Sequence, residues 1–217
     1  MTFHEIDRAH LVDALESTGP GVPTLCEGWQ TEHLAAHVVL RESSPLAAAG
    51  IVLPFARARA EAELDALAAT SSTPDGWADL VARVAAGPRR ISPVAWGGDK
   101  ANLVELAVHT EDVRRGTGPA EPLDRSPEHL DALFDQLRLM ARLYYRKVDT
   151  GVVLVVPGGR RAKVRSARGD AGTVVVRGTV LDLLLHATGR TEAAVVEIEG
   201  APDDVAGLER ALADGAV

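Results

Sequence analysis

Residues 102–113 read N-L-V-E-L-A-V-H-T-E-D-V, a run in which apolar side chains recur at the spacing of a buried helix. Glu105 and His109 stand four residues apart in this run. Side chains at positions i and i+4 lie one above the other on a helix, so a carboxylate oxygen and an imidazole nitrogen can reach the same ion. The stretch therefore predicts a buried helix that carries two candidate metal ligands on one face.

His37 is the best candidate for a third ligand. It lies in T-E-H-L-A-A-H-V-V-L, residues 31–40, beside Leu34 on the apolar side of another predicted helix. Two histidines and one glutamate leave coordination positions open for water or substrate, which is typical of a reactive metal centre rather than a closed structural one. Spacing alone also fits a surface pair or a hydrogen-bonded core contact between Glu105 and His109.

The first part of the chain is predicted to be helical throughout. Apolar periodicity and Gly, Pro and Ser punctuation predict helices at 3–17, 31–49, 55–69, 74–86, 100–115 and 127–146. Thr2 and Glu5 have the spacing of a capping box, and Thr73 and Ser126 each precede a proline at a first helical position. Residues 1–147 are therefore expected to form a helical bundle.

The pattern changes after Asp149, where β-branched runs predict strands at 151–156, 162–165, 173–177 and 194–199. Pro157-Gly158-Gly159 between the first two runs is typical of a hairpin turn. Short helices are expected at 180–188 and 203–213. By this interpretation residues 148–217 form a small α+β domain, and the whole chain is of the α+β class. The size of this domain is near the lower limit for independent stability.

Composition narrows the classes of protein. The chain has 217 residues, of which 46% are hydrophobic, and a formal net charge of −8, which argues against a nucleic-acid-binding surface. A single cysteine, Cys26, excludes an intrachain disulfide, and it is expected to pack as a small apolar side chain rather than act as a nucleophile. No apolar run is long enough to span a bilayer or form a leader, so we expect a soluble, cytoplasmic protein.

Three motifs resemble one family. T-L-C-E-G-W-Q-T-E-H-L-A-A-H (24–37) and E-L-A-V-H-T-E-D-V-R-R-G (105–116) resemble the DinB-like bundles of actinobacteria, in particular the N-terminal domain of mycothiol-dependent maleylpyruvate isomerases. G-T-V-L-D-L-L-L-H-A-T-G-R (178–190) resembles the sterol-carrier-protein-like C-terminal domain of the same enzymes. The resemblance spans nearly the whole chain and implies a DinB-like four-helix bundle followed by a sterol-carrier-protein-like α+β domain.

The resemblance also implies a site and a chemistry. The three metal ligands of the family fall on His37, Glu105 and His109, and Glu at position 105 matches the isomerase-like branch, whereas many DinB-like bundles have His there. Zn²⁺ is the first choice for these ligands, and Ni²⁺ or Fe²⁺ also suits them. The family relationship implies mycothiol as cosubstrate, with metal coordination supplying a thiolate that attacks a small electrophilic substrate in an isomerase or thiol transferase reaction. We expect no nucleic-acid or membrane partner, and a monomer or homodimer.

Two further residues are candidates for catalytic roles. Asp112, three residues after His109, is placed to hold the imidazole of a ligating histidine, although a salt bridge to Arg41 or Arg115 fits the sequence equally well. The guanidinium of Arg190 can form a bidentate pair with a carboxylate. The alternative is a structural contact to a helix end.

Two other functions fit the same residues. One is a metal-dependent hydrolase of an amide or thiol conjugate, in which Asp112 would be the general base. The other is a non-catalytic protein that binds a metal or a small ligand. An enzyme requires water-accessible ligands, whereas a purely structural metal would lie in a dry, closed core.

Overall fold

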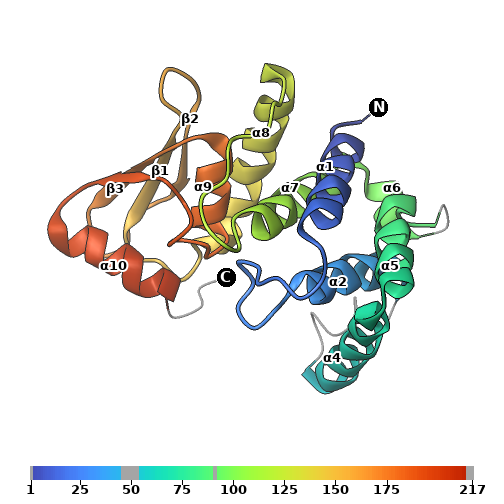
Figure 1. Cartoon of the computed structure of the whole chain (residues 1–217). Helices are drawn as coiled ribbons and strands as arrows, with labels where there is room; N and C mark the ends of the chain where they lie inside the picture. The colour runs from blue at the N-terminus through green and yellow to red at the C-terminus, as the bar shows by residue number, and fades with distance from the viewer. Residues whose placement is uncertain (1, 45–53, 90–91, 214–217) are drawn as a thin grey trace. The chain divides into compact units, whose positions relative to one another are not determined.

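The computed structural model describes residues 2–44, 54–89 and 92–213. The chain has α+β architecture and divides into two compact units, unit 1 (Met1–Ala120) and unit 2 (Glu121–Val217) (Figure 1). The sequence predicts a domain boundary near residue 147, whereas this division falls after Ala120. Among the described residues, no helix is long and apolar enough to cross a membrane.

Unit 1 is built from helices. Its elements are α1 (Phe3–Thr18), α2 (Thr31–Ser43), α4 (Pro54–Ala68), the 3₁₀ turn η1 (Ala69–Ser72), α5 (Pro74–Ala86), α6 (Pro93–Gly97) and α7 (Asp99–Arg114). Each helix predicted in this part has a counterpart, although residues 45–49 of the predicted helix 31–49 lie outside the described residues. The short helix α6 was not predicted, because five residues are too few for a periodic pattern.

Local capping signals act as the sequence indicates. The Glu5 carboxylate accepts a hydrogen bond of 2.7 Å from the backbone N–H of Thr2. The Thr73 side chain accepts a hydrogen bond from the backbone N–H of Gly76 at the start of α5. The Ser126 side chain accepts one from the N–H of His129 at the start of α8 (Pro127–Tyr144). These contacts satisfy backbone donors that have no partner inside the first turn of a helix.

Packing around α1 holds unit 1 together. Helix α1 lies alongside α7, and α2 packs against α4 and α5 (Figure 1). The shared core includes the fully buried side chains of Leu11, Leu15 and Leu34. Arg8 of α1 forms a buried ion pair with Glu42 of α2, and its Nη1 donates to the Val84 carbonyl at 2.8 Å. The pair is nearly inaccessible to water, so loss of either partner would leave an uncompensated charge in the core.

Unit 2 combines one long helix with a four-stranded sheet. Its elements are α8 (Pro127–Tyr144), β1 (Gly151–Val155), β2 (Arg161–Arg165), β3 (Thr173–Arg177), α9 (Val180–Ala187), β4 (Glu197–Glu199) and α10 (Pro202–Ala213). The strand order is β2-β1-β3-β4, and β1 pairs with β2 in the predicted antiparallel hairpin. β1 pairs with β3 in parallel, and β3 with β4 in antiparallel orientation.

Helix α8 explains the difference in domain boundary. Its apolar stripe includes the buried residues Leu133, Phe134 and Leu137. The helix contacts β2 and α9, so it belongs to the same unit as the sheet. The sequence assigned it to the bundle, because an amphipathic pattern shows which face of a helix is buried and not which core buries it.

A buried polar pair ties the end of α8 to α9. The Tyr145 hydroxyl lies 2.9 Å from Nδ1 of His186, a side chain that is 2% exposed. His186 therefore packs in the interior of unit 2. Burial lowers the pKa of His186 to about 4, because the interior disfavours the charged imidazolium.

This burial predicts acid sensitivity. Since the pKa of His186 in the folded protein lies below its ordinary value of 6.5, the unfolded chain takes up the proton first as pH falls. The stability that neutral His186 contributes is fully present above about pH 6.5 and is lost between about pH 6.5 and about pH 4. The free energy of unfolding should fall by about 3 kcal/mol over this range. Denaturant unfolding of the parent protein across this range should show the loss, and His186→Gln should remove most of it. An equal pH dependence in the two proteins would contradict the assignment.

Candidate metal centre

Helices α2 and α7 bring the three predicted ligands together. Nε2 of His37 lies 3.2 Å from Oε1 of Glu105, and Nε2 of His109 lies 3.2 Å from the same oxygen. The two imidazole rings meet edge to face with centroids 5.2 Å apart. The spacing argument for Glu105 and His109 on one helix face is therefore matched by the geometry, and His37 meets them from a second helix.

The local sequence explains why these side chains converge. On α7 the neighbouring residues Leu103, Leu106 and Ala107 are buried and anchor the helix in the core. The ring of Trp29, in the loop before α2, packs against the ring of His37 on α2, with centroids 5.1 Å apart. Both helices are thus fixed by apolar contacts close to the cluster.

The donor atoms fit a divalent cation. In a tetrahedral zinc site with metal–ligand distances of about 2.0–2.2 Å, neighbouring ligand atoms are about 3.3–3.6 Å apart. The two nitrogen-to-oxygen distances of 3.2 Å are close to this separation between ligand atoms. All three candidate ligand atoms lie within 4.8 Å of one another. The side chains of His37 and Glu105 are 25% and 29% exposed, so part of the cluster is accessible to water.

Asp112 contacts the other nitrogen of His109. Its Oδ2 lies 2.9 Å from Nδ1 of His109, and its side chain is fully buried. A carboxylate in this position holds the imidazole so that Nε2 faces the cluster, as ligating histidines usually require. Arg41, which the sequence offered as a partner of Asp112, donates to Asn102 and Ala101 and forms an ion pair with Glu105, and Arg115 donates to Glu111 at 2.8 Å.

Cys26 has a polar role that the sequence did not indicate. Its thiol packs against the core of unit 1, as expected, but also donates to Oδ2 of Asp112 at 3.2 Å. Cys26, His109 and Asp112 therefore form a second group of possible metal ligands that shares His109 with the first. Eighty-six residues separate Cys26 from Asp112, so no local spacing could have shown the contact.

Arg41 is the other residue that sequence reasoning did not place at the cluster. It lies on α2 four residues after His37, and its Nε is 3.2 Å from Oε1 of Glu105. The signal was present in the sequence, because a residue four positions after a candidate ligand on a helix shares its face.

The cluster shifts the proton affinities of its members. Burial raises the pKa of Glu105, but hydrogen bonds from His109 and His37 and the nearby positive charges outweigh it and hold that pKa well below the ordinary value. For His109, burial lowers the pKa, yet hydrogen bonds to Asp112, Cys26 and Glu105 raise it well above the ordinary value. Without a bound cation, the structure therefore favours an imidazolium at His109 beside the ionised carboxylate of Glu105.

Arg190 belongs to unit 2 and follows the end of α9. Its Nη1 donates to the Thr188 carbonyl at 2.8 Å, at the end of α9. This is the helix-end contact that the sequence offered as the alternative to a functional role.

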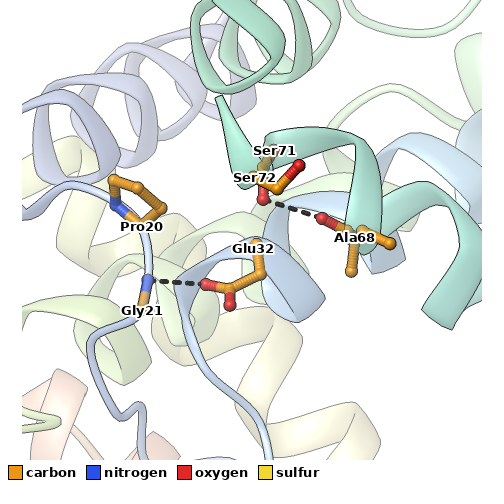
Figure 2. Close-up of a pocket in the computed structure, with 7 residues that line it drawn as sticks. Pro20, Gly21, Glu32, Ala68, Ser71 and Ser72 are labelled. Carbon is orange, nitrogen blue, oxygen red and sulfur yellow. Dashed lines mark hydrogen bonds between the residues drawn. The ribbon is translucent and has the colours of Figure 1, made fainter. Parts of the chain in front are cut away.

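A separate pocket of about 290 Å³ lies in unit 1 and involves none of these candidates. Its lining residues are Pro20, Gly21, Glu32, Ala68, Ala69, Ser71 and Ser72. Figure 2 shows two hydrogen bonds in its wall: the Glu32 carboxylate accepts from the N–H of Gly21 at 2.8 Å, and Ser71 donates to the Ala68 carbonyl at 2.7 Å.

Comparison with known proteins gives a relationship of fold. No protein-family model and no curated protein matches the sequence. A crystal structure of mycothiol-dependent maleylpyruvate isomerase matches with 21% identity and a TM-score of 0.57, over 92% of each chain. A histidine-to-alanine mutant of a mycothiol-dependent maleylpyruvate isomerase matches with 22% identity and a TM-score of 0.58, again over 92% of each chain. The chain is therefore similar in fold, over nearly its whole length, to mycothiol-dependent maleylpyruvate isomerase.

Proposed function

We propose that this protein is a metal-dependent enzyme that uses a low-molecular-weight thiol, mycothiol in particular, to isomerise a small electrophilic substrate or to transfer the thiol to it. The observation that carries the proposal is the convergence of His37, Glu105 and His109 at ligand-to-ligand distances that suit a divalent cation. The similarity of fold to mycothiol-dependent maleylpyruvate isomerase supports the choice of a thiol.

The three side chains would hold the cation through Nε2 of each histidine and a carboxylate oxygen of Glu105. A bound divalent cation favours the anionic form of a thiol and so supplies a thiolate at neutral pH. Zn²⁺ is our first choice, and Ni²⁺ or Fe²⁺ suits the same ligand types. The partial exposure of His37 and Glu105 leaves a side through which a small molecule can approach.

Charge balance supports an anionic fourth ligand. Glu105 and Asp112 contribute one negative charge each, Arg41 contributes one positive charge, and a divalent cation adds two. The cluster would then carry a single net positive charge, which a thiolate neutralises and a neutral ligand does not. Because the cluster is partly shielded from solvent, this difference is larger than it would be in water.

A hydrolase is the weaker candidate. It needs a general base within reach of a bound water, and Asp112 was the candidate from sequence. The side chain of Asp112 is fully buried and accepts hydrogen bonds from both His109 and Cys26. It is therefore occupied in orienting His109 rather than free to take a proton from water.

The finer assignments belong to the same proposal. They are a DinB-like four-helix bundle at residues 1–147, a sterol-carrier-protein-like domain at residues 148–217, a role for Arg190 in binding a substrate carboxylate, a cytoplasmic location, and a monomeric or homodimeric state.

The first test is metal content. Protein purified without chelator should hold close to one divalent ion per chain, and His109→Ala should lose it while keeping its helical circular dichroism. His10→Ala, a partly buried histidine of α1 outside the cluster, is the matched control and should keep the ion. Zinc affinity should rise with pH, because His109 must lose a proton to bind and its raised pKa extends this dependence above the ordinary range of histidine.

A parent protein that takes up no Zn²⁺, Ni²⁺ or Fe²⁺ at micromolar concentration would contradict the metal site. Equal loss of metal from His10→Ala and His109→Ala would show that the effect comes from general destabilisation.

The second test detects the thiol. In protein loaded with Co²⁺, thiolate coordination adds an intense near-ultraviolet charge-transfer band that imidazole, carboxylate and water do not give. Cys26→Ser is the background of choice, because it removes the chain's own thiol and keeps a hydroxyl that can donate to Asp112. Mycothiol should produce the band on this background. Absence of the band at saturating thiol, together with hydrolysis of an amide or ester, would favour the hydrolase.

A further inference from the structure

Cys26 links the loop before α2 to the buried side of α7. Its thiol donates a hydrogen bond to Oδ2 of Asp112 at 3.2 Å. Nδ1 of the candidate ligand His109 lies 2.9 Å from the same oxygen, also within hydrogen-bond distance. One carboxylate oxygen is therefore shared by the thiol and the imidazole.

The loop that carries Cys26 is held by hydrogen bonds on both sides of this residue. The backbone N–H of Cys26 donates to Oγ1 of Thr24 at 3.2 Å, and the Cys26 carbonyl accepts from the N–H of Trp29 at 2.9 Å. The N–H of Leu25 donates to the backbone carbonyl of Asp112 at 3.0 Å. The backbone next to Cys26 is thus bonded to the residue whose carboxylate the thiol contacts, which fixes the thiol beside that carboxylate.

Metal binding at His109 would give Oδ2 of Asp112 two donors. An imidazole that coordinates a cation through Nε2 carries its proton on Nδ1, and a carboxylate oxygen has two lone pairs. The Nδ1–H group and the Cys26 thiol would each use one of them. Because the side chain of Asp112 is fully buried, bulk water cannot replace a lost donor.

We propose that Cys26 is a positioning residue of the metal centre, whose thiol holds the Asp112 carboxylate toward Nδ1 of His109. The inference rests on the proposed metal site. With the thiol in place, rotation of the carboxylate away from His109 would break two buried hydrogen bonds instead of one. The imidazole is thereby kept with Nε2 toward His37 and Glu105.

The hydrogen bond of Cys26 can be measured apart from charge and apart from metal ligation. A thiol that donates is uncharged, so its replacement by serine or alanine alters no formal charge at the centre. Serine keeps a donor and alanine has none, although the two side chains are nearly the same size. Neither residue is a usual zinc ligand, so both replacements would weaken binding alike if Cys26 itself held the cation.

The test measures zinc affinity by competition with a coloured chelator, using zinc alone. Loss of an outer partner of a ligating histidine typically weakens metal binding roughly 10–100-fold. Cys26 stands one step beyond Asp112, so Cys26→Ala should bind zinc about tenfold more weakly than the parent, at the lower end of that range. Cys26→Ser should bind zinc nearly as tightly as the parent, because its hydroxyl can donate to Asp112.

Leu64→Val is the control for packing. Like Cys26, Leu64 is a partly buried side chain packed on the core of unit 1, but it lies on α4, which packs against α2. The substitution removes one methylene group and no hydrogen bond of a side chain. Its zinc affinity should equal that of the parent.

A second background shows whether Cys26 acts through Asp112. Asp112→Ala leaves no carboxylate for the thiol to hold, so it should itself weaken zinc binding roughly 10–100-fold. In this background Cys26→Ser and Cys26→Ala should bind zinc equally. A difference between them that persists without the carboxylate would overturn the positioning role.

The remaining outcomes are distinguishable. Parental zinc affinity in Cys26→Ala, or equal weakening in Cys26→Ala and Cys26→Ser, would overturn the positioning role and leave the metal site intact. If Cys26→Ala does not fold, Cys26→Val takes its place as the variant without a donor. A thiolate band in the Co²⁺-loaded parent without added thiol would show that Cys26 binds the cation itself, and would also overturn the role. A parent protein that binds no zinc would instead overturn the metal site, and this inference with it.

Discussion

The candidate metal centre depends on one constraint: the buried polar groups of α7 must be paired. This helix lies in the core of unit 1 and buries polar side chains together with apolar ones, among them Asn102, His109, Thr110, Glu111 and Asp112. A buried polar group without a partner destabilises the folded state, so each must meet a complementary group. Thr110 donates to backbone carbonyls of α1 and α7, and Glu111 pairs with the arginines at the end of α7. Asn102 and Asp112 instead meet Arg41 of α2 and Cys26 of the loop before α2, and these contacts hold α2 where His37 and Arg41 lie beside Glu105.

His109 decides on which side of its ring a cation would bind, because its two nitrogens face different groups. Nε2 faces His37 and Glu105, whose side chains are partly exposed, whereas Nδ1 faces Asp112, which is fully buried and also accepts from Cys26. An imidazole whose Nδ1–H donates to a carboxylate presents the lone pair of Nε2. The open side of the centre is thus the one with two histidines and a glutamate, and the buried side supports it.

The sequence predicted what depends on local spacing. Helical periodicity placed Glu105 and His109 on one face, proline and threonine signals marked helix starts, and β-branched runs located the strands. Contacts between distant segments were not accessible in this way: Cys26 and Asp112 are 86 residues apart, and nothing in their neighbourhoods indicates the pairing. The contacts of α8 with β2 and α9 were inaccessible for the same reason, since amphipathicity does not identify the partner of an apolar face.

The most direct test of the metal centre is anomalous X-ray diffraction from crystals of the zinc-loaded protein, recorded on both sides of the zinc absorption edge. The account predicts one strong anomalous peak in unit 1, about 2.0–2.2 Å from Nε2 of His37, Nε2 of His109 and an oxygen of Glu105. A peak between Cys26, Nδ1 of His109 and Asp112, or no peak at either group, would contradict it.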